Sequence, residues 1–151
     1  MTSATSKPPA LHIDTLVVKA DRIVCELALN PKLSLFTTPQ FAKIFVSRFP
    51  NLVNHTCKNP HGTTFGAAIN STALPHLFEH LVIDLQAKAS TSPDETFVGT
   101  STWTEKALGR ARVEVSFTDD LSALRAFRDA ARILNDALLE YGDLLAANDR
   151  V

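Results

Sequence analysis

Three side chains that could bind and use a metal ion lie within five residues of one another, at His76, Glu79 and His80. The segment around them is predicted to be helical, and residues three and four apart share one face of a helix. The two imidazoles could then hold a divalent cation, while the carboxylate beside them could take a proton from a water molecule that the metal activates. This spacing indicates metal-dependent hydrolysis rather than packing.

The five residues from His76 to His80 also reproduce the His-x-x-Glu-His signature of inverted zinc metallopeptidases. A motif this short occurs by chance as well, and a histidine on a partly apolar helix is more often a hydrogen-bonded structural residue than a ligand. The clustering of other ligand types favours the metal, because four of the five histidines fall between positions 55 and 80, together with Cys57.

The motif supplies two ligands, whereas a catalytic zinc ion usually has three protein ligands and one open position. Cys57 is the preferred third ligand because a thiolate binds zinc well, and His55 is the second choice. Asp84, four residues after His80, could accept a hydrogen bond from that imidazole and orient it. In insulinase-type inverted peptidases a downstream glutamate completes the set, and the candidates for that role are Glu105, Glu114 and Glu140.

Length, charge and cysteine content narrow the class of protein. A chain of 151 residues can form one domain whose hydrophobic core needs no metal to fold. With 15 basic and 16 acidic side chains, the net charge of −1 provides no field that would gather nucleic acid or an anionic membrane. The two cysteines, Cys25 and Cys57, are too few for a disulfide framework. Since the sequence also shows neither signal peptide nor membrane span, we expect a cytoplasmic protein without nucleic-acid or membrane partners.

A β-hairpin and a helix are predicted ahead of the motif. Residues 1–10, rich in Ser, Thr and Pro, are predicted to be a disordered tail. Residues 11–19 and 22–29 are rich in β-branched side chains, which predicts two antiparallel strands. Thr38 then caps a helix that Pro50 ends or bends.

The motif helix is predicted to begin at one of three capping residues and to run to about Ala89. Its apolar residues surround the histidines, so a buried helix is expected whose few charges are functional candidates. An irregular stretch over 51–70 precedes the helix and could reach over the site. The candidate caps are Asn70, Ser71 and Thr72.

A second hairpin and a last helix complete the predicted fold. Residues 97–104 and 110–117 are predicted to be strands, the second of which alternates apolar with polar residues as in a sheet with one wet face. The last helix follows a cap at Asp119 or Asp120. The order ββααββα predicts an α+β two-layer domain over residues 11–147, with a four-stranded antiparallel sheet and helices packed on one face.

Several segments carry a resemblance to a known family. Residues 54–57, Asn-His-Thr-Cys, are followed after a loop by residues 74–86, which read LPHLFEHLVIDLQ. This arrangement resembles the N-terminal domain of cyanophycin synthetase, in which an His-x-Cys element precedes a helix of the pattern HVxEHxxxELQ. Residues 97–100, Phe-Val-Gly-Thr, and the hairpin and helix after them are similar too, so the resemblance covers most of residues 11–140.

The resemblance implies that some domains of this family act as slow zinc metallopeptidases that cut an aspartate–arginine polymer into primers. His76 and His80 would then match the metal ligands and Glu79 the base. In that family the domain is fused to an ATP-grasp domain and a Mur-ligase-like domain. The sequence shows no segment that resembles either of them, so we expect a stand-alone copy here. Two stretches depart from the family pattern, residues 58–61 (Lys-Asn-Pro-His) and residues 102–104 (Thr-Trp-Thr). The substrate is therefore less closely defined than the metal.

Three hypotheses about function follow. The first is a zinc-dependent hydrolase that cleaves peptide or isopeptide bonds, with cyanophycin or a related Asp/Arg polymer as substrate and a homo-oligomer left open. The alternative is a non-catalytic homologue that binds a polymer or a protein partner through the same groove, and the third is a structural domain with an accidental motif. The intact His-Glu-His set favours the enzyme, because a binding module has no need of a carboxylate held where desolvation makes it costly.

Overall fold

The protein is built on a four-stranded antiparallel sheet, seen in a computed structural model that describes residues 8–92 and 94–145. The order of strands across the sheet is β1-β2-β6-β5, so the two predicted hairpins join through β2 and β6, and β5 lies at an edge. The strands are β1 (Leu11–Val18), β2 (Arg22–Leu29), β5 (Gly99–Glu105) and β6 (Arg110–Ser116).

The start of β1 is tied to the last helix, α4 (Asp120–Tyr141). The backbone N–H groups of Ala10 and Leu11 donate hydrogen bonds to Oδ1 of Asn135, at 2.8 and 3.0 Å, and Ala10 is buried. Of the predicted tail, residues 1–7 lie outside the described part of the chain, as does the very end of the predicted domain.

The sheet has one apolar face and one polar face. On the polar face, Arg22 donates to Glu114 and Arg112 donates to Glu26, each with an N···O distance of 2.7 Å between neighbouring strands. Along β2 and β6 the side chains alternate between the two faces, as the sequence pattern predicted. The buried side chains of these two strands are Ile23, Cys25, Leu27, Leu29, Ala111, Val113 and Val115.

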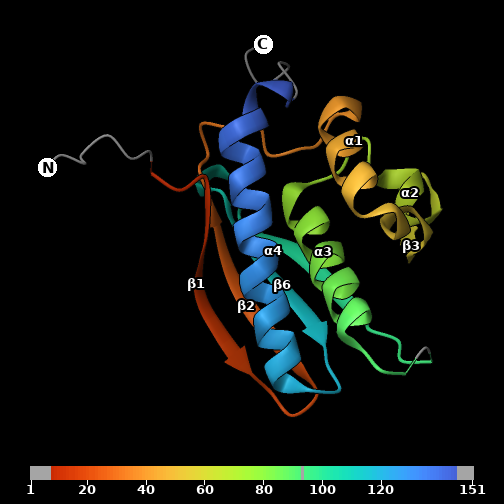
Figure 1. Cartoon of the computed structure of the whole chain (residues 1–151). Helices are drawn as coiled ribbons and strands as arrows, with labels where there is room; N and C mark the ends of the chain where they lie inside the picture. Colours follow the sequence, from red (N-terminus) through yellow and green to blue (C-terminus); the bar gives the residue numbers. More distant parts are fainter. Residues whose placement is uncertain (1–7, 93, 146–151) are drawn as a thin grey trace, which may run out of the picture.

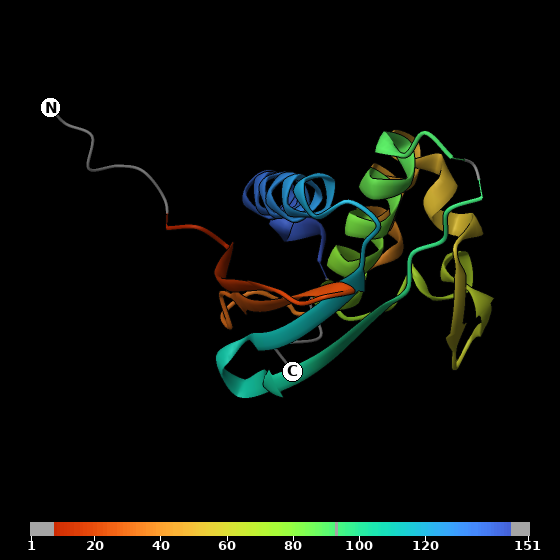
Figure 2. The ribbon, with the colours of Figure 1, turned by 90° about the horizontal axis from the view of Figure 1, so that it is seen from below.

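Two long helices, α3 (Leu74–Ala89) and α4, lie side by side over the apolar face, with the sheet as the second layer (Figures 1 and 2). On the side of α3 away from α4 lie α1 (Pro39–Arg48), α2 (Phe65–Ala68) and a small hairpin of β3 (Thr56–Asn59) and β4 (Gly62–Thr64) (Figure 1). The predicted α+β fold is confirmed, with β3, β4 and α2 added to the predicted order. Among the described residues, no helix combines the length and apolar character needed to cross a membrane.

The start of α3 differs from the prediction. The helix begins at Leu74, and its N-cap Ala73 makes no side-chain capping bond, so the cap predicted within residues 70–72 is wrong. The reason lies in a distant segment of backbone. Ala73 forms an isolated β-bridge with Phe36, and the N–H of Leu74 donates to the carbonyl of Leu35 at 2.9 Å, which satisfies a donor that a capping side chain would otherwise serve.

Gly109 closes the second hairpin in a conformation that favours glycine, with φ of 72°. A Cβ atom there would lie 2.1 Å from the carbonyl oxygen of Leu29. We therefore expect Gly109→Ala to lower the free energy of unfolding by at least about 2 kcal/mol. Gly142, with φ of −60° and no atom near its added Cβ, supplies a matched control. Urea denaturation followed by circular dichroism should show a loss for Gly109→Ala only, and equal effects would contradict this account.

Candidate metal and active site

The predicted motif lies on α3, on a face that borders a cavity of about 950 Å³. The cavity is also lined by the β3–β4 hairpin and by the first half of β5. The apolar side of α3, which includes Leu77 and Leu81, packs in the core, and this fixes the direction in which His76, Glu79 and His80 project. Three elements far apart in sequence therefore meet at the motif.

Cys57 on β3 completes a three-residue cluster with His76 and His80. One ligand atom from each residue lies within 4.8 Å of the other two, and Sγ of Cys57 is 3.2 Å from Nε2 of His76. A thiolate and two imidazoles are donors that zinc prefers, and three protein ligands leave a fourth tetrahedral position for water. The residues present therefore fit a catalytic zinc ion.

His55 lies beside this cluster and contacts His80, but it is not one of the three clustered residues. Its Nδ1 is 3.0 Å from Nδ1 of His80, and its Nε2 is 3.2 Å from Oδ1 of Asp84. Both ring nitrogens of His55 are therefore already engaged, which leaves Cys57 as the better third ligand. The expectation that Asp84 contacts His80 directly is corrected, because Asp84 reaches that imidazole only through His55.

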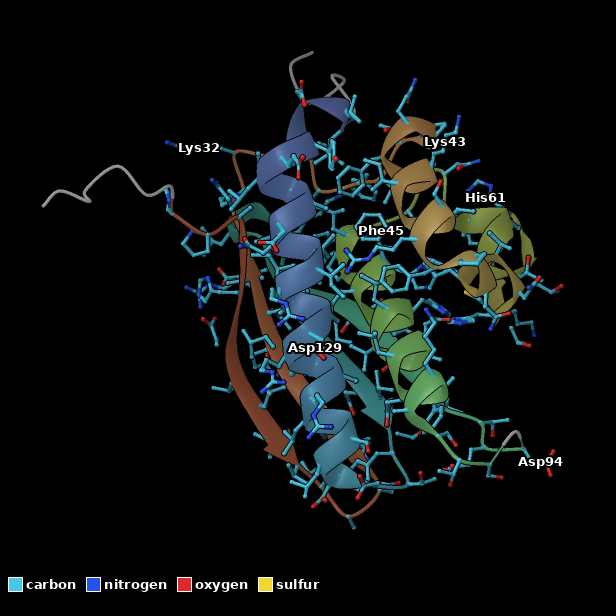
Figure 3. The ribbon with its side chains drawn as sticks, in the orientation of Figure 1. Lys32, Lys43, Phe45, His61, Asp94 and Asp129 are labelled. Atoms are coloured by element: carbon cyan, nitrogen blue, oxygen red, sulfur yellow. The ribbon has the colours of Figure 1, made fainter. Side chains whose placement is uncertain are left out.

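The downstream glutamates are placed away from the cluster. Glu114 is paired with Arg22 on the polar face of the sheet, opposite to the helices. Glu105 is exposed at the end of β5, and Glu140 is exposed near the end of α4. His61, the remaining histidine of the predicted cluster, is exposed at the β3–β4 turn, where Figure 3 shows it on the outer side of the molecule.

Glu79 is buried next to the cluster, with 5% of its surface exposed. Its Oε2 lies 3.7 Å from Nε2 of His80. Burial raises the pKa of Glu79 to about 7, against a smaller lowering effect of a hydrogen bond with Ser101. A carboxyl group that titrates near neutrality and lies beside a candidate metal site has the properties of a general base.

The position of Glu79 depends on a glycine of β5. A Cβ atom on Gly99 would lie 2.8 Å from Cγ of Glu79, so only glycine lets the edge strand run this close to the carboxylate. The sequence analysis did not identify Gly99 as part of the site. A glycine within a strand pattern is the signal that could have indicated such a close approach.

Burial keeps the two motif imidazoles in the form that binds metal. It lowers the pKa of His76, and it lowers the pKa of His80 to about 3 with further contributions from His76 and His55. Neutral imidazole has the lone pair that a metal requires. Burial also raises the pKa of the Cys57 thiol, so metal binding must displace a proton and is expected to strengthen as pH rises.

Two further residues that the sequence analysis did not assign to the site hold the imidazoles in place. Oγ1 of Thr72 is 2.8 Å from Nδ1 of His76, so a residue predicted as a helix cap instead tethers a candidate ligand. The ring of Phe65 stacks on the ring of His80, with centroids 4.0 Å apart and planes 16° apart. Both contacts restrict ring rotation, which favours a site formed before metal binds.

We expect the Glu79 carboxylate to destabilise the metal-free protein at alkaline pH. Its pKa is raised from 4.5 to about 7, so stability should fall as pH rises through that interval. The free energy of unfolding of metal-free Glu79→Gln should therefore exceed that of metal-free wild type by on the order of 2–3 kcal/mol at pH 8 and by almost nothing at pH 4. Denaturant titrations at the two pH values measure this difference. Glu105→Gln, which alters an exposed carboxylate, is the control, and a pH-independent gain for Glu79→Gln would contradict the burial argument.

The sequence matches the family model described as the cyanophycin synthase-like N-terminal domain over residues 22–139. This match covers more than three quarters of the chain and includes the cluster residues and Glu79. No curated protein matches the sequence. The chain belongs to the cyanophycin synthase-like N-terminal domain family.

Proposed function

We propose that this domain is a zinc-dependent hydrolase that cleaves peptide or isopeptide bonds in cyanophycin or a related Asp/Arg polymer. The observation that carries the proposal is the buried carboxylate of Glu79 beside the cluster of Cys57, His76 and His80. A carboxylate in that position costs stability, and general-base catalysis gives it a use.

Cys57, His76 and His80 would hold the metal, because they offer one thiolate and two neutral imidazoles around a common point. When bound, zinc would supply a Lewis acid that activates water near neutral pH. His80 is buried on the core side, while Cys57 and His76 are half-buried at the wall of the cavity, which would admit substrate.

Glu79 would move the proton. Its carboxylate would accept a proton from the attacking water and return it to the leaving amine, so that one group acts first as base and then as acid. Burial raises the pKa of Glu79 to about 7 in the metal-free protein, and the charge of a bound zinc ion would lower that pKa and favour the carboxylate that accepts the proton. Because Gly99 has no side chain, the backbone of β5 packs directly against the side chain of Glu79.

The lining of the cavity supports a substrate that carries charges of both signs. A volume of about 950 Å³ is at the upper end of small-molecule sites, and so accommodates several residues of a peptide. Lys58 and Glu95 line it in addition to the motif residues. Lys58 could pair with an aspartate carboxylate, and Glu95 with a guanidinium group.

The state of the cysteines supports a reducing compartment for this activity. Cys25 and Cys57 are both free thiols, and Cys25 is buried in β2. A thiol that serves as a metal ligand must stay reduced. We therefore assign the proposed activity to the cytoplasm.

Metal content tests the ligand set. Wild type purified without a metal-affinity tag should contain close to one zinc ion per chain, and Cys57→Ser, His76→Ala and His80→Ala should each lose most of it. His61→Ala is the matched control, because His61 is exposed on the same hairpin but is not one of the clustered residues. Elemental analysis gives the stoichiometry, and equal zinc in all five proteins would rule out this site.

Hydrolysis tests the role of Glu79. An amide cannot accept the proton of water, so Glu79→Gln should keep zinc and fold while losing hydrolysis by a factor of at least roughly one hundred. The substrates are cyanophycin and short β-aspartyl-arginine oligomers, with product release followed by chromatography.

Glu105→Gln should cleave these substrates as wild type does, because Glu105 is exposed and lies outside the cavity lining. If Glu79→Gln cleaves at the wild-type rate, Glu79 is not the base. If zinc-loaded wild type cleaves neither these substrates nor a general peptide library, the domain is a binding module.

A further inference from the structure

Three polar side chains form a hydrogen-bonded line behind the candidate metal site. Nδ1 of His80 is 3.0 Å from Nδ1 of His55, and Nε2 of His55 is 3.2 Å from Oδ1 of Asp84. Asp84 is 1% exposed and the side chain of His55 is 9% exposed. The opposite edge of the His80 ring faces Glu79, whose Oε2 is 3.7 Å from Nε2. His80 therefore has one nitrogen toward this line and the other toward the cavity.

We propose that Asp84 and His55 form a positioning pair that fixes the proton of His80 on Nδ1 and so presents its Nε2 lone pair to the metal. This inference rests on the proposed metal site, because it concerns how one ligand of that site is prepared. His55 is then a positioning residue rather than a ligand, which accounts for its place beside the cluster with one nitrogen toward His80 and the other toward Asp84.

The direction of the hydrogen bonds follows from Asp84. An ionised carboxylate can only accept, so the proton between the first two groups belongs to Nε2 of His55. A neutral imidazole that donates through Nε2 can only accept at Nδ1. The proton in the contact with His80 must therefore come from Nδ1 of His80, and this leaves Nε2 of His80 without a proton.

Two observations support an ionised Asp84. Nζ of Lys88 lies 3.4 Å from Oδ2, and it is held there by a second contact, 4.5 Å above the ring of Phe49. Burial of the carboxyl group raises the pKa of Asp84, but the hydrogen bond with His55 and the charge of Lys88 outweigh burial and lower that pKa below its usual value. The carboxylate is therefore a fixed acceptor at the end of the line.

The hydrogen bond that holds the ring of His76 defines its tautomer less well than the line from Asp84 defines the tautomer of His80. Nδ1 of His76 faces Oγ1 of Thr72 at 2.8 Å, and a hydroxyl group can either donate or accept. That contact holds the ring of His76 without selecting its tautomer. The line that ends at Asp84 does select one, and the stacked ring of Phe65 keeps His80 in the plane that this line requires.

The first test uses nuclear magnetic resonance on metal-free, full-length protein labelled with ¹⁵N in histidine, at pH 8. Long-range ¹H–¹⁵N spectra distinguish a ring nitrogen with a proton from one without it. We expect protonated Nδ1 and bare Nε2 on His80, and protonated Nε2 and bare Nδ1 on His55. A proton on Nε2 of His80, or protons on both nitrogens of His55, would overturn the inference without any variant being needed.

Two variants of His55 separate hydrogen bonding from filling of space. His55→Phe keeps a ring but removes both bonds, and it should mix or reverse the tautomers of His80 and weaken zinc binding by about 10- to 100-fold. His55→Gln can accept from His80 through Oε1 and donate to Asp84 through Nε2, so it should keep the tautomer of His80 and most of the affinity. Competition with a chromophoric chelator measures the affinities.

Variants of the neighbouring charges complete the design. Asp84→Leu removes the acceptor and should resemble His55→Phe, while Lys88→Gln leaves the line intact and should keep the tautomer of His80. If His55→Phe or Asp84→Leu fails to fold, the other variant and the wild-type spectrum still decide the matter. Unchanged tautomers and unchanged zinc affinity in either folded variant would overturn the positioning role.

The outcome is independent of whether the protein is an enzyme. Wild type that shows the expected tautomers and binds zinc, but hydrolyses nothing, refutes the proposed function and leaves this inference in place. Wild type that hydrolyses substrate with zinc bound, but has a proton on Nε2 of His80 when metal-free, refutes the inference and leaves the proposed function in place.

Discussion

The desolvation of polar groups on α3 is the constraint on which the rest of the site depends. A helix that packs in the core carries four nearly inaccessible polar side chains, which are Glu79, His80, Asp84 and Gln86. Each of them costs free energy unless it finds a partner, because the interior offers no water. Lys88 on α3 serves Asp84, but the other partners include His55 and the backbone of Ser116, which come from elements around the helix. This demand explains why a short hairpin and an edge strand lie against one face of the same helix.

Metal binding and proton transfer, the two roles in the proposed chemistry, depend on different elements around α3. Strand β3 and the turn before it bring Cys57 and His55, which face the two imidazoles, while β5 brings the bare backbone of Gly99 against Glu79. The ligands and the base are thus held by different neighbours of α3. A change in β5 is expected to disturb proton transfer before it disturbs metal binding, and a change in β3 to do the reverse.

Much of the fold could be predicted because its signals are local. Strand alternation located residues 22–29, and the capping threonine at Thr38 was identified, since both depend on a few adjacent residues. The β3–β4 hairpin and α2 were not predicted, because elements of three or four residues carry too little periodicity. The start of α3 was wrong for another reason. Its first N–H is satisfied by the backbone of Leu35, and no pattern near residue 74 shows this.

The candidate site, too, could be predicted only where its signals are local. The helical spacing placed His76, Glu79 and His80 on one face, and the donor chemistry of sulfur favoured Cys57 over His55. Sequence could not show that Asp84 acts through His55, because the contact spans 29 residues and depends on how the hairpin docks on α3. A buried carboxylate one helical turn after a ligand has two possible partners, the ligand or a residue from another element. Only tertiary structure distinguishes a direct tether from a relay through another residue. The relay constrains the tautomers of both His55 and His80, whereas a direct tether would constrain that of His80 alone.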